Sequence, residues 1–188
     1  MTREAAETQV KILDLAESLI RKGGYNGFSF REIAAGVGVK SSSVHYYFPT
    51  KADLGAKVAR RYTDRFMDAL GEPQDASKIA MDVVSQMHGS FADALADDGQ
   101  MCLCGVLAAE SAGLPTEVAG EAKEFFNRTA NWLNVSLQNS DWGKGRTSSE
   151  IEKQSLAVLA QLEGGLLIAR VQQQPDLFDL LTPRLPMD

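Results

Sequence analysis

Only two cysteines and two histidines occur among the 188 residues of this chain. Cys102 and Cys104 stand two positions apart, so on a helix they point to different faces and do not easily form a mutual disulfide. A structural zinc site needs about four ligands, and only His45 and His88 could join the cysteines. We therefore expect no metal site and two reduced thiols.

Long hydrophobic runs are also missing. No apolar stretch approaches the ~18 residues that a membrane span needs, and residues 1–7 contain no apolar segment of the kind found in secretory signals. We therefore expect a cytoplasmic protein that does not associate with a membrane.

Signatures of enzymes are absent as well. The sequence shows no nucleophile elbow, phosphate-binding loop, HExxH motif or dinucleotide fingerprint. Carboxylates such as Glu110 and Glu163 are available, but no residue pattern pairs them. We expect no catalytic activity and no cofactor.

The charge is unevenly distributed along the chain. Residues 1–66 hold 11 Lys and Arg against 7 Asp and Glu, a balance of +4, whereas the remainder holds 8 basic against 18 acidic residues, a balance of −10. A basic segment joined to an acidic one is typical of a polyanion-binding module fused to another domain. Chance clustering of solvated helix faces is the alternative explanation.

Helical periodicity runs through the whole sequence. Hydrophobic residues make up 44% of the chain, they recur at helical spacing without sustained alternation, and every proline falls where a helix could begin or stop. We predict an all-α protein of about nine helices. Outside residues 30–48, the predicted helices cover about 8–22, 51–70, 75–96, 101–112, 116–138, 149–173 and 175–182.

Residues 30–48 predict two short helices around Gly38, a residue suited to a tight turn with positive φ. Ser29 is placed to cap the first helix. The positions that would hold the two helices together are Ile33, Ala34, Val37, Val39 and Val44. This is the pattern of a helix-turn-helix, whose second helix enters the major groove of DNA.

The second of these helices has an unusual composition for a surface helix. It opens with Lys40 and three serines, which are poor in helix interiors but good hydrogen-bond partners for phosphates and base edges. His45, Tyr46 and Tyr47 follow and add hydrogen-bonding aromatic groups.

The chain resembles the TetR family of bacterial transcriptional regulators. The residues that carry the resemblance are Phe28–Ala34, Gly38–Val39 and Val44–Leu54, within a similar region of about residues 8–66. The commonest family pattern has Tyr where His45 stands and His where Tyr46 stands.

The resemblance implies contacts with DNA at nine positions. Base edges would be faced by Lys40, Ser41 and Ser42, and bases, thymine methyls or the DNA backbone would be touched by His45 and Tyr46. Residues facing phosphates would be Ser43, Tyr47 and Lys51, and Arg31 would reach either a phosphate or a base edge. Val44 and Phe48 would belong to the core.

The resemblance also implies a division of labour along the chain. Residues 1–50 would form the helix-turn-helix DNA-binding domain, and residues 51–188 a helical ligand-binding and dimerisation domain, with coupling through the helix at 51–70. A homodimer would form through the helices at 149–182, where Gly164 and Gly165 indicate a close helix approach. The apolar stripe of the helix at 149–173, which includes Leu156, Leu159, Leu162, Leu166 and Leu167, is explained equally well by an intramolecular core helix.

The expected function is that of a repressor that a small-molecule effector releases from operator DNA. Candidate residues for the effector pocket are Met67, Met87, His88, Phe91, Cys102, Phe125 and Trp132, although such residues are more often plain core. One alternative is a regulator that senses electrophiles or oxidants through Cys102, and another is a helical adaptor for a protein partner.

Overall fold

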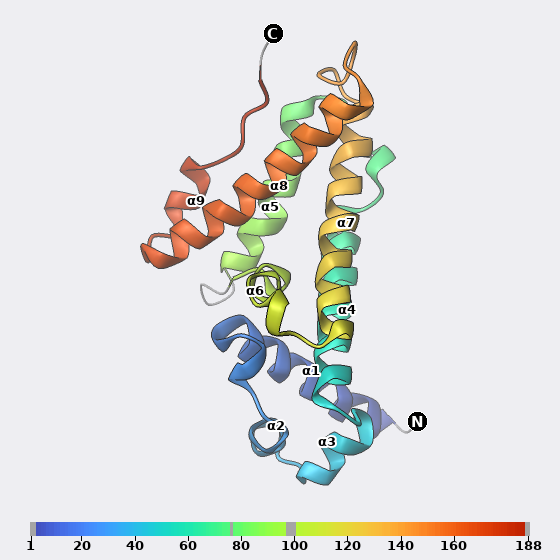
Figure 1. Ribbon diagram of the computed structural model, residues 1–188, viewed down its shortest axis with the longest axis vertical. Coiled ribbons are helices and arrows are strands. Elements are labelled where there is room, and N and C mark those ends of the chain that lie inside the picture. Colours follow the sequence, from blue (N-terminus) through green and yellow to red (C-terminus); the bar gives the residue numbers. More distant parts are fainter. Residues whose placement is uncertain (1–2, 76, 97–100, 187–188) are drawn as a thin grey trace. The chain divides into compact units, whose positions relative to one another are not determined.

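The computed structural model describes residues 3–75, 77–96 and 101–186, and Figure 1 shows the chain as a set of helices without a strand in these ranges. The all-α prediction is confirmed for them. Within the described ranges there are nine α-helices: α1 (Arg3–Gly23), α2 (Phe30–Val37), α3 (Ser41–Tyr47), α4 (Lys51–Leu70), α5 (Ala80–Ala96), α6 (Leu103–Ala109), α7 (Thr116–Gln138), α8 (Ser148–Val171) and α9 (Asp176–Leu180).

The helices form two compact units. Unit 1 comprises residues 1–63 and 103–125, and unit 2 comprises residues 64–102 and 126–188. Helices α4 and α7 therefore contribute residues to both units. None of the helices among the described residues is long and apolar enough to cross a membrane.

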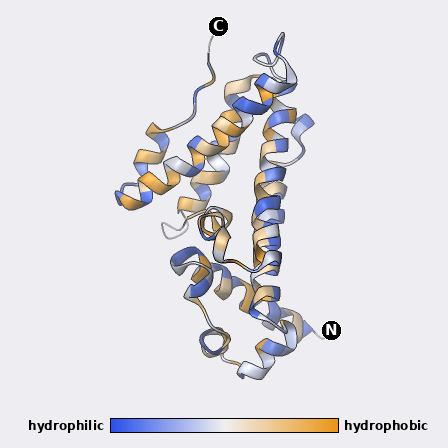
Figure 2. Ribbon diagram, viewed as in Figure 1, coloured by the Kyte–Doolittle hydropathy of each residue, from blue (hydrophilic) through white to orange (hydrophobic). Residues whose placement is uncertain are grey.

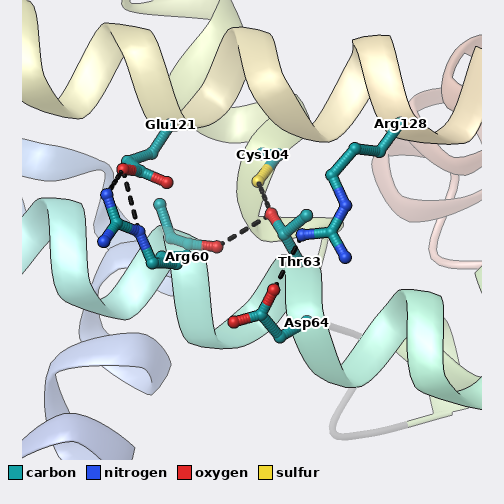
Figure 3. Close-up of polar contacts among 7 residues, drawn as sticks. Arg60, Thr63, Asp64, Cys104, Glu121 and Arg128 are labelled. Carbon is teal, nitrogen blue, oxygen red and sulfur yellow. Dashed lines mark hydrogen bonds and ion pairs between the residues drawn. The ribbon is translucent and has the colours of Figure 1, made fainter.

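Unit 1 is built on the amphipathic helix α1, whose apolar stripe is fully buried at Ile12, Ala16 and Ile20. Charged side chains tie α1 to α4, since Arg61 Nη2 lies 2.7 Å from Asp14 Oδ1 and 3.2 Å from Glu17 Oε2. In the same unit, Arg60 of α4 pairs with Glu121 of α7 (Figure 3). The Thr63 hydroxyl lies 3.9 Å from Cys104 Sγ.

A carboxylate far away in the sequence completes the turn after α1. Gly24 adopts φ 77°, and the following Tyr25 N–H donates to Glu110 Oε2 at 2.8 Å. The positive φ favours glycine here, and a Cβ atom at Gly24 would overlap Glu110 Oε1 and push this carboxylate away.

Unit 2 packs α5, α8, α9 and the second half of α7 around a core that includes Phe91, Trp132 and Leu162. Thr147 and Glu150 form a capping box at the start of α8. Arg128 of α7 pairs with Asp64 of α4 at 2.7 Å (Figure 3).

The predicted close approach on α8 occurs at one of the two glycines. A Cβ atom at Gly165 would lie 3.2 Å from the ring of Phe178 in α9, whereas one at Gly164 would meet no atom within 4 Å. Gly165 therefore lets α9 pack closely on α8.

Candidate nucleic-acid interface

The turn between α2 and α3 has the geometry that the sequence predicts. Gly38 lies in the left-handed region, with φ 79° and ψ 32°. Its N–H donates to Ala34 O at 3.0 Å, and the N–H of Val39 donates to the same carbonyl at 2.9 Å. Ser29 caps α2 by accepting the Glu32 N–H at 3.2 Å. In Figure 1, α2 and α3 follow α1 as a helix-turn-helix.

A small core holds the two helices together. Ile33, Ala34, Val44 and Phe48 are all buried, as the sequence predicts. Val37 and Val39 are only half-buried, because they lie at the ends of the turn. The orientation of α3 is thus fixed by Val44 from one side of the helix and Phe48 directly after it.

The opposite side of this pair of helices is polar and exposed. The exposed residues are Arg31, Lys40, Ser41, Ser42, His45 and Tyr46, and 82% of Tyr46 is accessible. Ser43, Tyr47 and Lys51 are half-buried. Since no acidic residue occurs between Ile33 and Ala52, the surface combines positive charge with hydroxyl groups, as a reader of phosphates and base edges needs.

Ring contacts orient the aromatic residues of this surface. His45 packs edge-on against Phe30 at a centroid distance of 4.6 Å, and Tyr46 packs against Tyr47 at 5.3 Å. Nothing in the sequence alone points to this role of Phe30. Phe30 on α2 positions the imidazole on α3, and only the three-dimensional structure brings the two rings together.

Lys51 differs from the other predicted contacts. Its ammonium lies over the rings of Phe28 and Tyr25, 4.4 and 4.8 Å from their centroids. Burial lowers the pKa of Lys51, and the nearby Glu110 carboxylate acts in the opposite direction. Lys51 therefore both supports unit 1 and carries positive charge beside α3.

The seven pocket candidates occupy different environments. Met87, Phe91, Cys102, Phe125 and Trp132 are buried, whereas Met67 and His88 are half-buried. Phe125 belongs to unit 1, where its ring centroid lies 5.9 Å from that of Tyr62. The other six candidates belong to unit 2.

Several of these side chains have structural partners. Trp132 Nε1 donates to Gly71 O at 2.8 Å. His88 stacks on Phe178 at 4.4 Å, and the rings of Phe66 and Phe91 lie 5.2 Å apart. Complete burial of Cys102 disfavours direct reaction of its thiol with oxidants in solution.

Two open pockets of unit 2 are lined by other residues. One of about 320 Å³ lies around Trp142 and Arg146, and one of about 280 Å³ lies around Asn131 and Leu156.

The structure also reveals a buried acid. Both carboxylate oxygens of Glu163 on α8 are buried, and no described residue forms a hydrogen bond of ordinary geometry with either. Burial raises the pKa of Glu163 to about 7, and the Cys102 thiol lowers it by a smaller amount. A helical pattern of apolar residues gives no sign of such a site, because a single glutamate usually lies on the solvated face.

Residues 12–58 match the family model described as bacterial regulatory proteins, tetR family. A curated relative, the HTH-type transcriptional regulator CymR of Pseudomonas putida, is 30% identical over 100 residues, which cover 50% of this chain and 46% of that protein. The match thus spans about half the length of the relative.

Solved structures extend the similarity to almost the whole chain. A TetR transcriptional regulator from Legionella pneumophila is 30% identical, with a TM-score of 0.83 over 92% of this chain and 91% of its own. A TetR-family regulator from Agrobacterium tumefaciens is 27% identical, with a TM-score of 0.86 over 95% of each chain.

Proposed function

This chain belongs to the TetR family of bacterial transcriptional regulators, and from that membership we propose that it represses its target genes until a small-molecule effector releases it from operator DNA. It is a DNA-binding regulator rather than an enzyme, and we place it in the cytoplasm. The observation that carries the proposal is the exposed polar surface of α3, held outward by the buried Val44.

The reading surface divides into base contacts and phosphate contacts. We assign Lys40, Ser41, Ser42, His45 and Tyr46 to base edges and groove atoms, where hydroxyl, imidazole and phenol groups give sequence preference. Ser43, Tyr47 and Lys51 hold the backbone phosphates, and Arg31 reaches a phosphate or a base edge. Residues 1–50 form the DNA-binding domain in this proposal.

Residues 51–188 form the ligand-binding and dimerisation domain. Exposed apolar side chains on α8 support a homodimer through residues 149–182; they are Leu156, Leu167, Ile168 and Val171. Figure 2 shows hydrophobic residues at intervals along the length of α8.

We place the effector site within unit 2, among Met67, Met87, His88, Phe91, Cys102 and Trp132. A ligand that binds better to a dimer conformation in which the two DNA-binding domains are wrongly spaced lowers the affinity for DNA by linkage. Helix α4 is suited to the coupling because it contributes to both units.

Lys51→Ala tests the DNA-binding role. We expect weaker binding to specific and non-specific DNA alike, and a salt dependence flatter by about one unit of slope, because a phosphate contact is lost. Fluorescence anisotropy on DNA from upstream of the coding sequence, at several salt concentrations, measures both quantities. A changed sequence preference with an unchanged slope would contradict the phosphate role of Lys51.

The release mechanism has its own test. A thermal-shift screen of metabolites identifies ligands, and each hit is then added to the protein–DNA complex. We expect a stabilising ligand to lower operator affinity. A ligand that stabilises the protein and leaves operator affinity untouched would argue against release.

A further inference from the structure

Glu163 is a buried carboxylate with an unmet need for hydrogen-bond donors. Its two oxygens have no partner of ordinary hydrogen-bond geometry among the described residues. One turn away on α8, Leu159 and Leu166 are buried and apolar, whereas Ala160 and Leu167 are exposed. The Cys102 thiol is close enough to affect the carboxylate, but a thiol is a weak donor.

Burial of this carboxylate without hydrogen-bond donors costs free energy in the protein without a ligand. A carboxylate removed from water without compensating hydrogen bonds is costly, and buried carboxylates in proteins are therefore normally paired or protonated. Burial raises the pKa of Glu163 to about 7, so near neutral pH the side chain is neither fully charged nor fully neutral. A partner that donates hydrogen bonds would favour the charged form.

A second copy of the chain is poorly placed to be that partner. Leu167, on the surface proposed for dimerisation, stands one turn from Glu163 and is 58% exposed, but the carboxylate oxygens of Glu163 are already covered within one chain. A missing donor must therefore enter unit 2 itself. A buried water and a bound ligand are the two possibilities that the experiment below separates.

We propose that Glu163 is the recognition residue of the effector site and that the effector is a small organic amine whose ammonium group donates to the Glu163 carboxylate. An ammonium offers three donors and no acceptor, which complements a carboxylate that only accepts. The apolar neighbours of Glu163 select a hydrocarbon group on the amine.

That the amine acts as an effector rests on the proposed function. Binding of an amine at Glu163 does not depend on it. Because the oxygens are covered, the amine must displace side chains to reach them. Binding therefore favours a different conformation of unit 2, which is the differential affinity that a ligand-driven switch requires.

The test compares primary amines with alcohols of the same shape. Propylamine, hexylamine and phenethylamine are paired with 1-propanol, 1-hexanol and 2-phenylethanol in thermal-shift and calorimetric titrations of the full chain at pH 8. We expect at least one amine to raise Tm more than its alcohol. Glu163→Gln should weaken that amine at least about tenfold, the loss of one charge-assisted hydrogen bond, with little effect on the alcohol.

Asp93→Asn is the matched control, since it makes the same change to an exposed carboxylate of unit 2, and it should leave amine affinity unchanged. The wild type should bind the amine more weakly at pH 6 than at pH 8, because Glu163 is protonated more often at pH 6. The amine affinity of Glu163→Gln should be the same at both pH values. Glu163→Met serves in its place if Glu163→Gln does not fold by circular dichroism.

Two results would overturn the inference. One is that no amine stabilises the wild type more than its matching alcohol does. The other is that the Glu163 variant binds the amine as tightly as the wild type, as expected if a buried water satisfies Glu163. Operator binding is measured in parallel. Selective amine binding at Glu163 without operator release supports the inference and overturns the release mechanism. Release from the operator by a ligand whose affinity does not depend on Glu163 supports the release mechanism and overturns the inference.

Discussion

One backbone angle at Gly38 sets the turn between α2 and α3. Because a Cβ atom at this position would meet nothing within 4 Å, replacing Gly38 tests the left-handed conformation alone, without a steric clash. We expect Gly38→Ala to lower the free energy of unfolding by about 1–2 kcal/mol, the cost of placing an L-residue in this region.

Gly120→Ala is the control for this prediction. Gly120 is an exposed residue within α7, with no atom within 4 Å of an added Cβ, so alanine there should stabilise the chain by up to about 1 kcal/mol. Urea denaturation measures both variants. Equal effects of the two substitutions would contradict the role assigned to Gly38.

Titration of Glu163 alone makes the free energy of unfolding depend on pH. Below about pH 4.5 the carboxyl is protonated in both the folded and the unfolded chain. Between there and its folded pKa of about 7, the unfolded chain releases the proton while the folded chain keeps it. The free energy of unfolding therefore falls as pH rises through this window, by about 3 kcal/mol in total, and changes no further above it.

The measurement is urea denaturation of wild type and Glu163→Gln between pH 5 and pH 8. Glutamine does not titrate, so the difference in unfolding free energy between the two proteins should shift in favour of the variant as pH rises. A constant difference across this range would mean that the folded carboxyl titrates at its ordinary pKa.

At the scale of the element, α3 carries both a core residue and a residue that we assign to DNA contact. Val44 is fully buried and Tyr46 is 82% exposed, although they stand two residues apart. We expect Val44→Ala to lower the free energy of unfolding by about 2 kcal/mol. Tyr46→Ala should change it by less than about 0.5 kcal/mol while weakening operator binding about tenfold or more. Thermal unfolding and anisotropy titrations test the pair, and a large loss of stability in Tyr46→Ala would place its ring in the core.

Elements with strong local signals were predictable from the sequence. Helices α4 and α7 begin and end at the predicted residues, 51–70 and 116–138, because Thr50 and Pro115 precede them and polar turns follow. Helix α5 begins at Ala80 rather than near residue 75, since Pro73–Asp75 forms a separate 3-10 helix. Local pattern does not distinguish a short 3-10 turn from the first turn of an α-helix.

Contacts between distant elements were beyond the reach of the sequence. Glu110 binds the Tyr25 N–H across 85 positions, and Lys51 lies over Phe28 rather than pointing freely outward. A lone carboxylate or lysine looks the same in the sequence whether it is solvated or buried. The turn, the Ser29 cap and the buried positions Ile33, Ala34, Val44 and Phe48 were predictable because they all fall within about twenty consecutive residues.

At the scale of the whole molecule, charge and dimerisation act together. The basic N-terminal part favours DNA and the acidic remainder is repelled by it, which orients the approach of the regulator. One helix-turn-helix reads few base pairs, so useful specificity requires two of them held at a fixed spacing. In the proposed homodimer, the interface between the two copies is therefore part of what recognises DNA.

The exposed apolar side chains of α8 make this dependence testable. Leu167 is 58% exposed and Val171 is 79% exposed, and burying a glutamate between two copies would be strongly unfavourable. We expect Leu167→Glu to be monomeric by light scattering and to bind the operator at least about a hundredfold more weakly, since each head then binds alone. Ile79→Glu, which places the same charge at a 55% exposed position outside α8, should remain dimeric and bind normally. A dimeric Leu167→Glu variant with full operator affinity would show that the two copies meet elsewhere.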